Sequence, residues 1–245
     1  MVIMMNLLAK RIKHIQGGKP MIKQLPMYLL LLLCGLLLIT PDGRAGEADQ
    51  KFTSGMYEGL MLAVDDKGEL LGYFEQSLGA VNVTCAFLLK GKDSNGQASI
   101  VTWSDQLFEG GLDNPEKYFF PGLLRRSKTI HGKDAVNIKV EQGHGHPGCS
   151  MTIGPQIGEE GISLSRNYEA KWVSLKLVKS KRTSLFSAPS IDKKTKAYFI
   201  SRDVLGVLAV NGDWINVEFP RDGKKMIKGW VRSDDVEDLQ PPQKK

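Results

Sequence analysis

The chain has 245 residues and a formal net charge of +6. The positive excess lies at the N-terminus, because residues 1–45 contain six Lys or Arg side chains and one acidic side chain. The rest of the chain is close to neutral, with 27 basic and 26 acidic residues. A nucleic-acid-binding protein needs a concentrated basic surface to displace counterions, so this composition argues against that class.

The first 45 residues have the layout of a secretory leader. Lys19 and Lys23 precede thirteen uncharged, mostly leucine residues, Met27–Ile39, and small residues then lead to a cleavage site expected near Ala45. This order is typical of a signal peptide. The apolar run is shorter than the ~20 residues that a membrane-spanning helix needs. We therefore expect a natural start at Met21, a periplasmic or secreted protein, and no transmembrane segment in the mature chain.

Residues 46–174 are expected to form a β-rich N-terminal domain, either an antiparallel β-barrel or a curled sheet. Short β-rich runs separated by Gly, Asn and Asp dominate this region, and helical spacing is scarce. Besides the first hairpin, strands are expected at Asn82–Lys90, Ala98–Ser104, Ala135–Glu141, Ser150–Ile153 and Gly161–Arg166. The glycine- and proline-containing segment Asp105–Arg126 is expected to be irregular.

The first hairpin is the clearest element of this region. A strand over Gly55–Val64 is followed by the turn Asp65–Gly68, and Glu69–Ser77 returns. If Val64 faces Glu69, Leu60 faces Tyr73. The same register places Glu58 opposite Glu75.

The C-terminal region, 175–240, is expected to form a second all-β domain, followed by a disordered tail at 241–245. Its charge differs in sign from that of the first domain: residues 46–174 carry −5 and residues 175–245 carry +6. The link is expected at Trp172–Val178, and Asn211-Gly212 between two β-rich runs is a strong hairpin signal. The other expected strands are Arg182–Ser187, Ala197–Ile200, Val204–Val210, Trp214–Phe219 and Met226–Arg232.

About 180–240 resembles the bacterial SH3 domain family. The matching segments are Ser187–Ser190, then Asn211–Trp214 leading to Val217, then Gly229-Trp230-Val231. The opening strand departs from the family, which often has an Asn-Val-Arg-Ser run there. The resemblance implies an SH3-like five-stranded barrel that binds peptides or proteins.

Three aromatic residues are the candidate ligand-binding residues. Trp214 alternates with Ile215 and Val217 and should therefore project from the opposite side of its strand. With Tyr198 and Trp230 it could line an aromatic groove, the usual ligand surface of SH3-like barrels. The alternative is that these aromatics only seal a small barrel.

Two cysteines, Cys85 and Cys149, remain after the leader is removed. In an oxidising compartment such a pair predicts one disulfide, here between two neighbouring strands. The alternative is two free thiols, one of them used for metal binding or catalysis. His144, His146 and Cys149 could hold zinc or copper, but an exposed turn explains their spacing better.

Two catalytic arrangements are weaker alternatives. One cysteine could pair with His131, His144 or His146 in a hydrolase, although Cys85 lies in a strand-like segment. Glu58 and Glu75, if opposed, would have the spacing of a retaining glycosidase, but an exposed sheet face explains them equally well.

The sequence thus favours an exported non-catalytic binding protein of the bacterial envelope that recognises a cell-wall peptide or an envelope protein. An inhibitor or immunity protein would be one form of it. We expect no cofactor and no metal. The alternative is a peptidoglycan-directed hydrolase with an SH3-like targeting domain.

Overall fold

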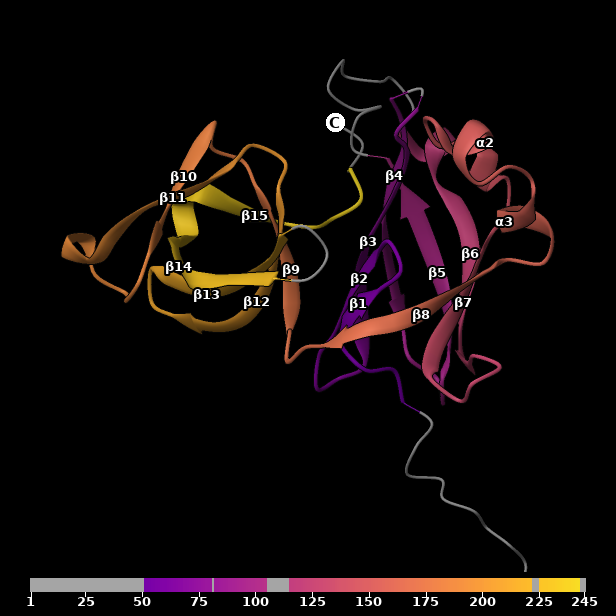
Figure 1. Cartoon of the computed structure of the whole chain (residues 1–245), viewed down its shortest axis with the longest axis horizontal. Coiled ribbons are helices and arrows are strands. Elements are labelled where there is room, and N and C mark those ends of the chain that lie inside the picture. The colour runs from indigo at the N-terminus through magenta and orange to yellow at the C-terminus, as the bar shows by residue number, and fades with distance from the viewer. Residues whose placement is uncertain (1–50, 81, 105–114, 222–224, 243–245) are drawn as a thin grey trace, which may run out of the picture. The chain divides into compact units, whose positions relative to one another are not determined.

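The computed structural model describes residues 51–80, 82–104, 115–221 and 225–242, which form two antiparallel sheets (Figure 1). Strands β1–β8 form a closed barrel, and β9–β15 form a curled seven-stranded sheet. The all-β fold class is therefore confirmed. The expected leader over 1–45, its expected cleavage site and residues 243–245 of the expected tail lie outside the described residues. In the described part of the chain, no helix is long and apolar enough to cross a membrane.

The barrel is a simple meander in which each strand pairs with the next and β1 pairs with β8. Alternating side chains on each strand fill the interior, as expected for eight strands. The strands are β1 (Gly55–Tyr57), β2 (Leu60–Val64), β3 (Glu69–Leu78), β4 (Val83–Lys92), β5 (Gln97–Trp103), β6 (Phe120–Lys128), β7 (Asp134–Val140) and β8 (Ile162–Glu169). Two short helices, α2 (Cys149–Thr152) and α3 (Gln156–Glu159), lie between β7 and β8.

The register predicted for the first hairpin is wrong by one residue. Val64 pairs with Leu70 instead of Glu69, and Leu60 pairs with Phe74. The Asp65 N–H donates to the Glu69 carbonyl, so the loop has three residues and its last one, Gly68, adopts a φ of +77°. A three-residue hairpin loop favours glycine at this left-handed position.

The expected continuous strand over Gly55–Val64 is also interrupted. It is divided into β1 and β2 at Glu58 and Gly59, where Gly59 has a φ of +76°. A Cβ at Gly59 would lie 2.7 Å from the carbonyl oxygen of Glu75. Glycine is therefore required for this close turn.

Two other expectations for the barrel are wrong. Phe120–Lys128 is strand β6, although the sequence suggested irregular structure through Arg126. Its inward-facing Phe120 and Leu124 contribute to the barrel core. The expected strand Ser150–Ile153 is instead largely helix α2, because a short apolar run does not distinguish a strand from a helical turn.

The second sheet has the order β11-β10-β14-β13-β12-β9-β15. The Asn211-Gly212 hairpin forms as expected between β12 and β13, with Asn211 paired to Trp214. The resemblance implied five strands, and the sheet has two more because β9 and β15 extend its edge. The strands are β9 (Ser174–Val178), β10 (Arg182–Phe186), β11 (Lys194–Ile200), β12 (Val204–Asn211), β13 (Trp214–Arg221), β14 (Lys225–Arg232) and β15 (Val236–Asp238).

The outer surface of the barrel and the second sheet share one cluster of buried apolar side chains, within a compact unit of residues 48–245. The barrel contributes outward-facing residues of β2, β4 and β5, such as Met61, Leu88 and Trp103. The second sheet contributes Leu175 and Leu177 of β9, together with residues nearby. The chain passes from one sheet to the other between β8 and β9.

Trp172 in this link is fixed by a buried carboxylate. Its Nε1–H donates to Glu218 Oε2 over 2.8 Å, and the Tyr168 hydroxyl donates to Glu218 Oε1 over 3.4 Å. Glu218 is 2 % exposed and also forms an ion pair with Lys228, which raises the pKa of that lysine. The carboxylate therefore ties residues of β8, the link and the second sheet together.

Gly206→Ala should lower the free energy of unfolding by about 2 kcal/mol, because its Cβ would overlap a buried ring. The Cβ would lie 2.4–2.6 Å from three atoms of the Trp172 indole. Urea denaturation measures the loss. Gly79→Ala is the matched control, because a Cβ at Gly79 meets no atom within 4 Å. Equal stability of the two variants would contradict this packing.

Candidate functional site

The three predicted ligand-binding aromatics lie on the outer side of the second sheet. Their chain neighbours Phe199, Ile215 and Val231 are in the core of that sheet, so alternation turns Tyr198, Trp214 and Trp230 outward. Tyr198 is on β11, Trp230 on β14 and Trp214 on β13. We call the outer surface that carries Tyr198, Trp230 and Trp214, together with the buried Phe186 packed against Trp214, the aromatic face.

Phe186 joins the two tryptophans of the aromatic face. It pairs with Trp230 across β10 and β14, and its ring lies edge-on to Trp214 at 4.9 Å between centroids. Phe186 was not among the predicted ligand-binding residues, although its position next to the core residue Leu185 was a usable signal. Tyr198 is 49 % exposed, whereas Trp214 and Trp230 are half-buried.

Two arginines accompany these rings. The Arg182 guanidinium lies 3.8 Å from the centroid of Tyr198, and that of Arg232 lies 5.1 Å from the centroid of Trp214. Arg232 is also 3.5 Å from Asp213. The aromatic face therefore combines flat apolar rings with cationic groups, a combination common in recognition surfaces.

The predicted disulfide between Cys85 and Cys149 is present, with 4.4 Å between the Cα atoms. It does not join two strands as expected, because Cys149 begins helix α2 while Cys85 lies on β4. Both residues are fully buried in the barrel core. While the bridge is intact, neither sulfur can act as a thiolate nucleophile or metal ligand.

His146 enters the barrel interior and is only 1 % exposed, so the expectation of an exposed turn is wrong for this residue. Thr102 Oγ1 donates to the Phe120 carbonyl and so accepts from His146 Nε2–H over 2.9 Å. The imidazole stacks on Phe87 at 4.8 Å. Burial lowers the pKa of His146 from 6.5 to about 4, so this side chain is neutral at physiological pH.

The proposed metal ligands are not brought together. His146 points into the barrel, His144 is exposed, and Cys149 is bound to Cys85. Among the described residues, no group of three or more His, Cys, Asp or Glu side chains could hold a metal ion.

The two candidate carboxylates are not opposed. The corrected register places Glu75 beside Gly59, whose carbonyl accepts from the Glu75 N–H over 2.7 Å. Glu58 instead bonds to Ser165: its N–H donates to the Ser165 carbonyl over 3.0 Å. His131, a candidate partner for a catalytic cysteine, is exposed in the turn between β6 and β7.

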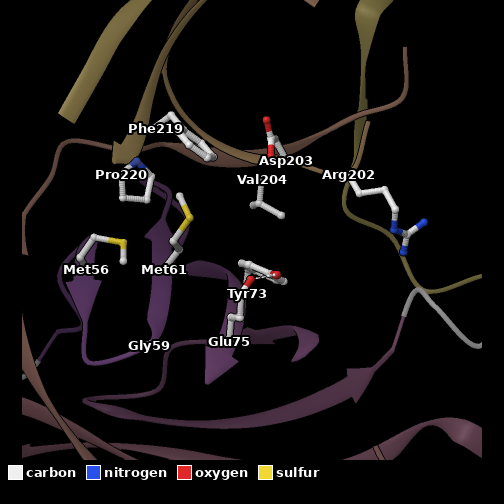
Figure 2. A pocket seen from close by; sticks show the side chains of 10 residues that line it. All are labelled: Met56, Gly59, Met61, Tyr73, Glu75, Arg202, Asp203, Val204, Phe219 and Pro220. Carbon is white, nitrogen blue, oxygen red and sulfur yellow. Dashed lines mark hydrogen bonds between the residues drawn. The ribbon is translucent and has the colours of Figure 1, made fainter. Parts of the chain in front are cut away.

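A cavity of about 310 Å³ lies where the barrel meets the second sheet; we call it the seam cavity. Figure 2 shows Met56, Met61, Phe219 and Pro220 on one side and Arg202 on the other, with Val204 and the Tyr73–Glu75 pair between them. No sequence pattern indicated this cavity, because its walls come from strands and turns far apart in the chain. Its lining residues are Met56, Gly59, Met61, Tyr73, Glu75, Arg202, Asp203, Val204, Phe219 and Pro220.

Polar groups in the seam cavity are fixed by internal hydrogen bonds. The Tyr73 hydroxyl donates to Glu75 Oε2, and burial together with this bond raises the pKa of Tyr73. Asp203 Oδ2 accepts from the Ile200 N–H over 2.9 Å. Burial raises the pKa of Asp203, an effect that this bond partly offsets. Arg202 has a φ of +78°, a conformation that costs a non-glycine residue about 1 kcal/mol.

Comparison with protein-family models, curated proteins and solved structures found no match to this chain. The function therefore has to be inferred from its own residues.

Proposed function

We propose that this chain is an exported, non-catalytic binding protein of the bacterial envelope that recognises a cell-wall peptide through the aromatic face. The observation that carries the proposal is that Tyr198, Trp214 and Trp230 all face outward from the second sheet, with the buried Phe186 packed edge-on against Trp214. Tyrosine and tryptophan dominate the binding energy of many recognition surfaces. The leader-like N-terminus and the SH3-like motif support the same proposal.

The charge of this region favours a ligand that carries carboxylates. Residues 175–245 carry a net charge of +6, and Arg182 and Arg232 lie directly over rings of the aromatic face. A peptide could place apolar groups on the rings and carboxylates against the guanidinium groups, which bind carboxylates well. Cell-wall peptides have free carboxylates and fit this description.

The hydrolase alternative has less support from its own candidate residues. Cys85 is held in a disulfide, and Glu58 and Glu75 do not face each other. A binding function needs neither group.

Retention of the purified exported protein on peptidoglycan sacculi tests the proposal. Trp214→Ala and Tyr198→Ala should each weaken retention by about tenfold, the effect expected of a central aromatic contact. Val210→Ala is the matched control, because Val210 is an exposed apolar residue of the same sheet outside the aromatic face. Retention is measured from the protein that remains free over a series of sacculus concentrations.

Fluorescence gives a second readout, because Trp103 and Trp172 are 1 % exposed and only Trp214 and Trp230 are accessible to quenchers. Bound sacculus fragments should protect these two residues from acrylamide.

Equal losses of retention on sacculi in Trp214→Ala and Val210→Ala would contradict recognition by the aromatic face. Absence of retention in the unsubstituted protein would refute a cell-wall ligand, and a co-purifying envelope protein would then identify the other class of partner.

A further inference from the structure

We propose that the seam cavity is a second binding site, which takes an aliphatic primary ammonium group such as a lysine side chain of a partner. This site is separate from the aromatic face, so the two proposals can fail independently. Three properties of its lining carry the inference: an apolar wall of suitable size, two fixed carboxylates, and aromatic rings beside them.

The apolar wall matches an aliphatic chain. Met56 and Met61 come from the barrel, and Val204, Phe219 and Pro220 come from the second sheet. Unbranched methionine side chains adapt well to a flexible ligand chain. The volume of about 310 Å³ is at the lower end of small-ligand sites, which suits one long side chain better than a larger ligand.

The carboxylates supply the charge complementary to an ammonium group. The bonds from the Tyr73 hydroxyl and the Ile200 N–H hold one oxygen of Glu75 and one of Asp203 in place, so little ordering is needed on binding. The raised pKa of Asp203 shows that burial disfavours its charged form, and a bound cation would offset that effect.

The rings and the charge balance also favour a cation over an anion. Tyr73 and Phe219 line the cavity, and aromatic faces attract ammonium groups. Two carboxylates outnumber the one guanidinium, that of Arg202. Figure 2 shows Arg202 on the side away from Met56 and Met61, with Glu75 between them.

A neighbouring cavity of about 190 Å³ shares Tyr73, Arg202 and Val204 with the seam cavity. In the proposal, this neighbouring cavity takes the peptide backbone that carries the lysine side chain.

Methionine methyl NMR of the purified exported protein tests the inference, with Nα-acetyl-lysine N-methylamide as the probe. Only four methionines follow residue 45: Met56, Met61, Met151 and Met226. The probe should shift the ¹³C-methyl signals of Met56 and Met61 in a saturable way. Met151, 62 % exposed on α2, should not move and is the internal control. The norleucine analogue is the matched neutral probe, and the glutamate analogue is the anionic one.

Two variants separate the contributions to binding. Glu75→Gln together with Asp203→Asn should weaken lysine-probe binding by about tenfold, as expected for the loss of two partly exposed charge contacts. Arg202→Gly should strengthen it, because a repelling charge is removed while glycine accepts the φ of +78°. Unchanged methyl signals of the buried core in each variant confirm that the fold is retained.

Each other outcome overturns the inference. Equal shifts with the norleucine analogue would show a site that is only apolar. Binding of the glutamate analogue that disappears in Arg202→Gly would show an anion site. No movement of Met56 or Met61 with the lysine probe would mean that the seam cavity binds no such side chain.

Discussion

Replacing Cys85 and Cys149 together with alanine should lower the free energy of unfolding by about 4 kcal/mol. The disulfide links residues separated by 64 positions, so its loss releases a long loop in the unfolded chain. The bridge also holds the segment that begins α2 against β4. Gly148 lies so close to this strand that a Cβ there would be 2.1 Å from the Thr84 carbonyl oxygen. Urea denaturation under non-reducing conditions measures the change.

Reduction of the disulfide provides the control for this substitution. Dithiothreitol should destabilise the unsubstituted protein to nearly the level of the double variant and leave the variant itself unchanged. The bond would be disproved by rapid alkylation of both cysteines in the unreduced protein. If the alkylated protein kept its full stability, packing alone would be holding the segment around α2.

Acidification should destabilise the protein through His146 by about 3 kcal/mol between pH 6.5 and pH 4. Burial lowers the folded-state pKa to about 4, below the unfolded value of 6.5, so the unfolded chain binds this proton first as the pH falls. The destabilisation that His146 causes is absent above pH 6.5 and complete below about pH 4. The cause is the burial of the ring against Phe87 and Phe120. Within the described residues, Nδ1 has no hydrogen-bond partner.

The difference in stability between His146→Leu and the unsubstituted protein, measured over this pH range, isolates the effect. The His146→Leu variant should lack the part of the pH dependence that comes from His146, whatever its free energy of unfolding at neutral pH. His144→Gln, which alters an exposed histidine two residues away, should retain the dependence. If the NMR signals of His146 titrate near pH 6.5 in the folded protein, the ring is not buried as described.

The sequence by itself determined the features that depend on local pattern and chemistry. Alternating β-rich runs predicted the all-β fold, and Asn211-Gly212 predicted the hairpin, because few other residues adopt the required turn. Two cysteines in a chain expected to be exported predicted the disulfide that joins Cys85 to Cys149. The alternation around Trp214 predicted that it faces away from Ile215, because neighbouring strand residues point to opposite sides.

Only the tertiary structure decided the features that depend on closure and long-range packing. The one-residue change in the first hairpin depended on whether Asp65 paired with Glu69, which composition does not determine. Barrel closure made β6 a strand, because the side chains of Phe120 and Leu124 fill the interior. Burial of His146 required the rings of Phe87 and Phe120, which come from different strands, to enclose it.

The seam cavity is another feature that only the tertiary structure decided, because it depends on long-range packing. Met56 and Phe219, which share its lining, are far apart in the sequence and belong to different sheets. No local pattern links them, whereas packing of the two sheets against one buried cluster brings them together. The sequence therefore determined the fold class, several of the strands and the outward direction of Trp214, and the meeting of the two sheets decided where a cavity lies, because that depends on contacts between distant residues.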